Sequence, residues 1–159
     1  MDIWQVLRRH EGIAFTPYCD LCGGKIVRYL GHWRCDCAPF GEVAGEMTIG
    51  IGHNLSARPL TETQVQDILG EDVAAIVGEL GKLAWFDQLD PIRAQAITDM
   101  AFTMGVVGVQ GFREMIDSLM TQDWGAAADA IIQSKWAREA PTRAAEDAAA
   151  IRTGAWVLA

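Results

Sequence analysis

The chain has 159 residues, of which 50% are hydrophobic and 21% are charged, so wholesale disorder is excluded and one folded domain is expected. Its formal net charge of −8 argues against a nucleic-acid binder and gives no attraction to an anionic membrane surface. The N-terminus lacks the long apolar segment of a secretory signal, and no other stretch is long and apolar enough to anchor the chain in a bilayer. We therefore expect a chain that is made in the cytoplasm.

The first part of the chain combines one short helix with strands. Asp2 followed by Gln5 forms a capping-box pattern, which predicts a helix over residues 2–11 that ends at Glu11. Residues 14–55 are rich in glycine, cysteine, aromatic and β-branched residues, a composition typical of hairpins and loops. We expect a small β-containing lobe here.

After this region the pattern becomes helical. Thr61 and Gln64 form a second capping box, and apolar residues at helical spacing predict one long helix over residues 61–80. Asp90 followed by Pro91 predicts the start of another helix, which continues to Gly105. Further helices are expected over residues 112–120, 124–135 and 141–151. The predicted fold class is α+β, with a small lobe, a connecting helix and a mostly helical lobe.

Three residues of the first part carry groups that glycoside hydrolysis needs. Glu11 and Asp20 supply two carboxyl groups, one to donate a proton and one to activate water, and Thr48 adds a hydroxyl. Each acid alone is best explained as an ordinary solvated side chain, because charged residues are mostly exposed. Together with the Gly-rich run that follows Thr48 and ends in His53 and Asn54, they favour a catalytic set.

The order and spacing of these and later segments resemble the phage-type lysozymes, the T-even phage lysozyme family of peptidoglycan muramidases. The resemblance covers most of the chain, and the following segments carry it: Glu11-Gly12, Tyr18-x-Asp20, Thr48-Ile-Gly-Ile-Gly-His53, Asp90 with Arg93, Met100-Ala-Phe-x-Met-Gly105, Gly108-Val-x-Gly-Phe112, Ser134-Lys-Trp136, Pro141-Thr-Arg-Ala144 and Arg152-Thr-Gly-Ala-Trp156. It implies a lysozyme-like fold with two lobes. The small lobe would span residues 12–60, the connecting helix 61–80, and the helical lobe 81–159 together with helix 2–11.

The resemblance also implies a role for each matching residue. Glu11 matches the family's general acid, Asp20 the carboxylate that orients and deprotonates the attacking water, and Thr48 the hydroxyl that holds this water. The remaining matches are supporting or substrate-binding: Arg143 would pair with the acid, His53 would form a structural ion pair with Asp72, and Asn54 and Phe102 would line the sugar-binding cleft. Two further cleft positions fall on Met115 and Ala130, neither of which is polar.

The activity implied by the resemblance is hydrolysis of the β-1,4 bond between N-acetylmuramic acid and N-acetylglucosamine, with inversion, by a phage or prophage endolysin. Such an enzyme needs no catalytic cofactor, acts as a monomer, and reaches the bacterial cell wall after release from the host cytoplasm. Two alternatives stay open. A lytic transglycosylase would use the same acid without an activated water, and an inactive lysozyme scaffold could carry a zinc-binding module.

Four cysteines lie in the long segment between Asp20 and Thr48 or beside it, where classical members of the family have a short hairpin. The pattern Cys19-x2-Cys22 followed by Cys35-x-Cys37 can supply four thiolates to a structural Zn²⁺, with His32 as a reserve ligand. The insert would span residues 19–47. One alternative is a pair of disulfides, Cys19 with Cys37 and Cys22 with Cys35, formed in an oxidising compartment. Four buried thiols are the other.

Overall fold

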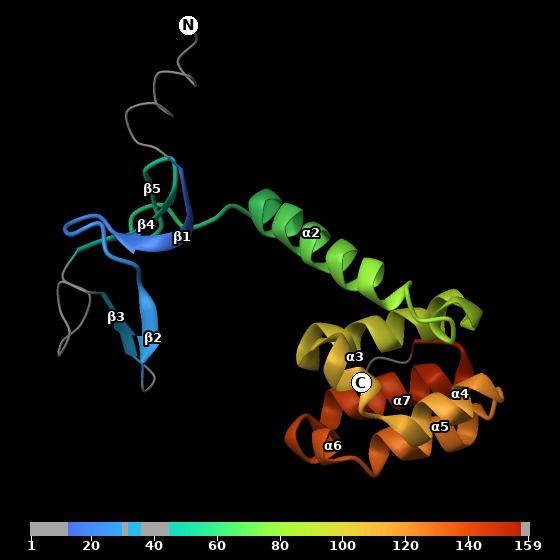
Figure 1. Cartoon of the computed structure of the whole chain (residues 1–159). Coiled ribbons are helices and arrows are strands. Elements are labelled where there is room, and N and C mark those ends of the chain that lie inside the picture. The colour runs from blue at the N-terminus through green and yellow to red at the C-terminus, as the bar shows by residue number, and fades with distance from the viewer. Residues whose placement is uncertain (1–12, 30–31, 36–44, 157–159) are drawn as a thin grey trace, which may run out of the picture. The chain divides into compact units, whose positions relative to one another are not determined.

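The computed structural model describes residues 13–29, 32–35 and 45–156 of the chain. The helix predicted over residues 2–11 lies outside these residues. The chain divides into two compact units, Met1–Val65 and Gln66–Ala159. Among the described residues the first unit holds the strands and the second is helical (Figure 1), which agrees with the predicted α+β fold class.

Within its described residues, the first unit contains two small antiparallel sheets. Strands β1 (Ala14–Cys19), β4 (Met47–Gly50) and β5 (His53–Asn54) form a sheet in the order β1-β4-β5, so β4 is central. Strands β2 (Val27–Tyr29) and β3 (His32–Arg34) form a separate hairpin. A small buried cluster of Cys19, Ile26 and Cys35, with Met47 packed against it, lies in this unit. The prediction of hairpins and loops over residues 14–55 is confirmed.

The helices begin close to where the sequence predicts them. Helix α2 (Glu62–Leu80) starts after Thr61, and the side chains of Thr61 and Gln64 each accept the other's backbone N–H, as in a capping box. Helix α3 (Pro91–Gln110) starts after Asp90, and its helical dihedral angles break at Gly105, where φ is 76°. The later helices are α4 (Arg113–Met120), α5 (Trp124–Ile132), α6 (Lys135–Glu139) and α7 (Pro141–Thr153), joined to α2 by the short 3-10 helix η1 (Phe86–Gln88) ahead of α3.

The prediction of one helix over residues 124–135 is wrong. Helix α5 ends at Ile132 and α6 begins at Lys135, because the Ser134 hydroxyl accepts the backbone N–H of Ala137 at 3.0 Å and caps a new helix. Serine favours this position because its hydroxyl satisfies an amide that the first helical turn leaves without a partner.

One hydrophobic core holds the helical unit together. Helices α3 to α7 contribute most of its buried residues, and α5 packs against α4 and α7 (Figure 1). The largest fully buried apolar side chains are Leu80, Ile97, Met100, Met115, Ile131 and Ile151. Trp136 is buried in this core, while Trp124 and Trp156 are half-buried against it. Among the described residues, no helix is long and apolar enough to cross a membrane.

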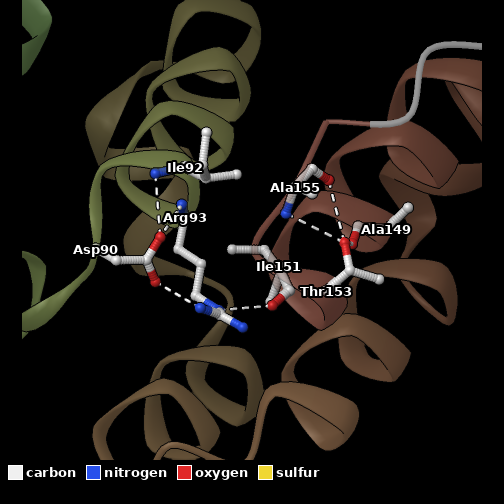
Figure 2. A network of polar contacts seen from close by, with 7 residues as sticks. All are labelled: Asp90, Ile92, Arg93, Ala149, Ile151, Thr153 and Ala155. Atoms are coloured by element: carbon white, nitrogen blue, oxygen red, sulfur yellow. Dashed lines mark hydrogen bonds and ion pairs between the residues drawn. The ribbon is translucent and has the colours of Figure 1, made fainter.

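Arg93 ties the start of α3 to the end of α7 (Figure 2). Its guanidinium pairs with Asp90 and donates through Nε to the backbone carbonyl of Ile151 at 2.7 Å. The same guanidinium lies 4.0 Å from the ring centroid of Trp124. The Asp90 carboxylate also accepts the backbone N–H groups of Ile92 and Arg93, at 3.1 and 3.2 Å. Burial alone would raise the pKa of Asp90, but the hydrogen bonds and charge of Arg93 hold that pKa below its usual value.

Asp90→Ala is expected to lower the free energy of unfolding by about 1–2 kcal/mol, because it removes a helix cap and the charge that pairs with Arg93. Thermal or urea unfolding at neutral pH measures this loss. The pKa of Asp90 is lower in the folded state, so its contribution is present at neutral pH and disappears as the pH falls through that value. The control is Glu79→Ala, which breaks the exposed ion pair with Lys82 and should cost less than about 0.5 kcal/mol. Equal losses in the two variants would contradict the assignment.

Candidate active site

Thr48 lies on the central strand of the three-stranded sheet. The antiparallel register pairs it with Tyr18 of β1 and with Asn54 of β5. Only 4% of Thr48 is exposed, so its position is set by neighbours on both sides of the strand. The β-branched pair Thr48-Ile49 favours the extended conformation that this central position requires.

Asp20 directly follows strand β1 and is held by the strand that carries Thr48. Its backbone N–H donates to the carbonyl of Glu46 at 3.1 Å, and its Oδ1 accepts the backbone N–H of Glu46 at 2.7 Å. The side chain remains exposed. Two hydrogen bonds to one residue fix both the backbone and the carboxylate of Asp20, while leaving the carboxylate accessible.

The strand register relates Asp20 to Thr48. Tyr18 is opposite Thr48, and Cys19, the last residue of β1, is opposite Met47. Asp20 follows Cys19 and is hydrogen-bonded to Glu46, which lies two residues before Thr48. The Asp20 side chain is exposed, whereas Thr48 is buried.

His53 and Asn54 support the turn that follows β5. The Oδ1 atom of Asn54 accepts the backbone N–H of Ala57 at 2.9 Å, and Nε2 of His53 lies 2.9 Å from the backbone carbonyl of Arg58. His53 donates this hydrogen bond when the ring proton is on Nε2. Asp72 belongs to the second unit, and its ion pair with His53 stays a prediction. The structure gives Asn54 a turn-forming contact that the sequence analysis did not anticipate.

Arg143, at the start of α7, makes two contacts with α3. Its Nε lies 2.9 Å from Oδ2 of Asp99, and its Nη1 donates to the hydroxyl of Thr103 at 2.7 Å. Phe102, which is 43% exposed, lines a pocket of about 390 Å³ together with Arg143. The structure therefore brings together two residues that the resemblance assigns to the site. Glu11 lies outside the described residues, so its pairing with Arg143 stays a prediction.

Asp147 is a buried acid that the sequence analysis missed. It is 1% exposed, and neither carboxyl oxygen has a hydrogen-bond partner within the part of the chain that the structure describes. Burial, together with the neighbouring Asp99 carboxylate, raises the pKa of Asp147 to about 8, and the nearby charge of Arg143 opposes this rise only in part. The signal was present in the sequence, because Asp147 shares the helical spacing of the buried residues Ala144, Ala148 and Ile151.

A larger cavity is lined by other residues of the helical unit. It has a volume of about 700 Å³, and Met115 and Ala130 both line it, beside Phe112 and Trp136. Charged side chains from the two helices α4 and α6 also reach it, namely Arg113, Glu114, Lys135 and Glu139. The two cleft positions expected from the resemblance thus share one cavity that is lined by both apolar and charged side chains.

Three of the four cysteines converge in the first unit. The sulfur atoms of Cys19, Cys22 and Cys35 all lie within 4.8 Å of one another, with Cys19 and Cys35 buried and Cys22 exposed. Cys37 lies outside the described residues. Such a group of thiols is able to bind a metal ion.

Comparison with known proteins decides the family. The family model described as phage lysozyme matches residues 34–146, which is more than half of the chain. The chain belongs to the phage lysozyme family. A curated relative, the pre-baseplate central spike protein Gp5 of Enterobacteria phage T4, is 25% identical over 165 residues. This match covers 97% of the present chain but only 28% of the relative, so the chain spans about a quarter of that protein's length.

The matched residues include Thr48, His53, Asn54, Phe102 and Arg143. The match begins after Glu11 and Asp20, so these two assignments rest on the sequence pattern and, for Asp20, on the sheet geometry.

Proposed function

We propose that this chain is an endolysin-type muramidase that hydrolyses the β-1,4 bond between N-acetylmuramic acid and N-acetylglucosamine. The observation that carries the proposal is the pairing of β1 with β4, which sets Tyr18 opposite Thr48, together with the hydrogen bond that holds the Asp20 carboxylate at the amide of Glu46. Family membership supplies the substrate class. The proposed partner is bacterial peptidoglycan, acted on by a monomer after its release from the host cytoplasm.

The proposed mechanism divides the work between two carboxyl groups. Glu11 protonates the leaving glycosidic oxygen, while Asp20 removes a proton from a water molecule that the Thr48 hydroxyl helps to orient. The water attacks the anomeric carbon from the face opposite the leaving group, so the configuration inverts. This requires the carboxyl groups of Glu11 and Asp20 to be about 6.5–9.5 Å apart, which leaves room for the water. A separation near 5 Å would instead make Asp20 a nucleophile, with retention.

The remaining roles follow the same proposal. Arg143 would balance the charge of Glu11 while it is held by Asp99 and Thr103, and Phe102 and Asn54 would contact sugar rings. His53 and Asp72 would form a structural ion pair. We assign the small lobe to residues 12–60 with its insert at 19–47, the connecting helix to 61–80, and the helical lobe to 81–159 with helix 2–11. The cysteine cluster takes a structural rather than a catalytic role.

A lytic transglycosylase is the main alternative, and the products distinguish it. Purified peptidoglycan is digested with the full chain, and the released fragments are analysed by mass spectrometry and by NMR of the anomeric proton. Hydrolysis adds one water to each cleaved bond and leaves a reducing N-acetylmuramic acid, formed first as the α anomer. A transglycosylase leaves an anhydro sugar that is lighter by one water, and that product would overturn the proposal.

Asp20→Asn tests the role of the water-activating carboxylate. The amide keeps the shape and one acceptor oxygen but cannot take a proton, so kcat should fall by about 10²–10⁴-fold. Asp117→Asn is the matched control, because Asp117 is exposed on α4 and should leave the rate unchanged. A rate within a factor of a few of the unsubstituted enzyme would show that Asp20 is not the base.

A further inference from the structure

The three converging cysteines come from two separate parts of the chain. Cys19 ends strand β1, Cys22 lies in the turn that follows, and Cys35 directly follows strand β3. Their sulfur atoms are within 4.8 Å of one another. Three thiolates bound to one tetrahedral zinc at about 2.3 Å would be separated by about 3.8 Å, so small adjustments suffice to complete such a site. A disulfide, by contrast, would use only two of these three sulfur atoms and would leave the third thiol unbonded next to it.

The turn between Cys19 and Cys22 is built to present both sulfurs. The backbone N–H of Cys19 donates to the carbonyl of Gly24 at 2.9 Å, and that of Gly23 donates to the carbonyl of Cys19 at 2.8 Å. Gly23 has a φ of 69°, which favours glycine. The backbone N–H of Gly24 points to the sulfur of Cys22 at 3.3 Å. An N–H donor at the sulfur offsets the negative charge that a thiolate ligand carries.

We propose that Cys19, Cys22 and Cys35 bind one Zn²⁺ ion, and that this structural metal centre positions the Asp20 carboxylate for catalysis. The second half of the proposal rests on the proposed function. Thiolate ligands select zinc over magnesium or calcium, which prefer oxygen. The fourth ligand of the tetrahedron is outside this proposal, and Cys37 remains the sequence prediction for it.

Asp20 is the chain neighbour of a proposed ligand, so fixing the Cys19 sulfur also restrains the backbone that carries Asp20. The side chains of both residues also approach Gly45. A Cβ atom on Gly45 would lie 2.7 Å from the Cys19 sulfur and 2.5 Å from Oδ1 of Asp20, so its backbone packs closely against both. The metal would therefore restrain Asp20 through Cys19 and through this packing.

The first arm of the experiment measures metal binding. The full chain is purified without added metal, its zinc content is determined by elemental analysis, and the reduced, metal-free protein is titrated with Co²⁺ under argon. We expect one zinc per chain and, with Co²⁺, the intense absorption of a tetrahedral thiolate site. Cys22→Ser and Cys35→Ser should abolish both signals. Ile26→Val, which alters the same buried cluster without removing a sulfur, should retain them.

The second arm measures positioning. Removing the metal should lower kcat by about 10–100-fold with little change in KM, and adding Zn²⁺ back should restore kcat. The helical unit should keep its thermal transition throughout. Asp20→Asn should retain one zinc per chain although it loses activity, which separates the ligands from the residue that they position.

Each outcome bears on one half of the proposal. Disulfides among these cysteines in freshly purified, zinc-free protein, or a reduced protein that gives no thiolate absorption with Co²⁺, would overturn the metal centre and leave the proposed function standing. Full activity in protein shown to be free of metal would overturn the positioning role alone. Full activity of Asp20→Asn in a protein that still binds zinc would overturn the proposed function and keep the metal centre.

Discussion

Glu11→Gln should abolish the clearing of outer-membrane-stripped cells while the protein keeps its thermal stability. The amide has nearly the same shape as the carboxyl group but cannot donate the proton that the leaving oxygen needs. General acid catalysis contributes about 10²–10⁴-fold to such rates, so residual activity should lie near the limit of a turbidity assay. The variant should still bind peptidoglycan in a pull-down, because the sugar contacts of the cleft are unchanged.

The control for this experiment is Glu71→Gln. Glu71 is exposed on α2, and it carries the same chemical change at a site with no proposed role. Its rate should equal that of the unsubstituted enzyme. If Glu11→Gln clears cells as fast as Glu71→Gln does, the general acid is another residue.

Asp147→Asn is expected to stabilise the protein at neutral pH and to flatten its pH dependence. The pKa of Asp147 is about 8 in the folded protein, against an ordinary value of 3.8. Between these two values the folded state holds a proton that the unfolded state has released. The free energy of unfolding therefore falls as the pH rises between these values, by about 1.4 kcal/mol per pH unit. An amide is neutral at every pH, so the variant lacks this loss.

Thermal unfolding between pH 4 and pH 9 checks the prediction for Asp147. The groups that face this side chain are Asp99 on α3 and Arg143 and Glu146 on α7, and all three remain in the variant. Asp117→Asn on the exposed side of α4 is the control and should keep the full slope. A variant Asp147→Asn whose stability falls with pH as steeply as the unsubstituted protein would show that Asp147 is charged in the folded state.

The helix starts were predictable because their signals are local. Thr61 with Gln64, and Asp90 with Pro91, place hydrogen-bond acceptors beside amides within one turn, and no distant residue is needed. The break at Ser134 was missed because its local signal is ambiguous. Serine is tolerated inside a helix, and only the packing of α5 and α6 on either side of the break decides that its hydroxyl caps a new helix.

The candidate site was predictable where chemistry and spacing coincide. The cysteine spacing predicted that Cys19, Cys22 and Cys35 would converge, and the Gly-rich motif placed Thr48 on a strand. The contact of Asp99 with Arg143, and the burial of Asp147 beside Asp99, join helices far apart in the sequence. Only the tertiary packing of α3 against α7 brings these charges together, so no local pattern could reveal them.

The hydrogen bonds between Asp20 and Glu46 join residues 26 positions apart, and they have a consequence for how this loop can vary. The segment leaves the sheet after Asp20 and returns to it at Glu46, so these hydrogen bonds fix where it begins and ends. The parts of the segment that carry neither Cys22 nor Cys35 are therefore an exchangeable cassette. Their length and sequence can change without altering the register that sets Tyr18 opposite Thr48, provided that the two cysteines keep the metal centre that we propose to position Asp20.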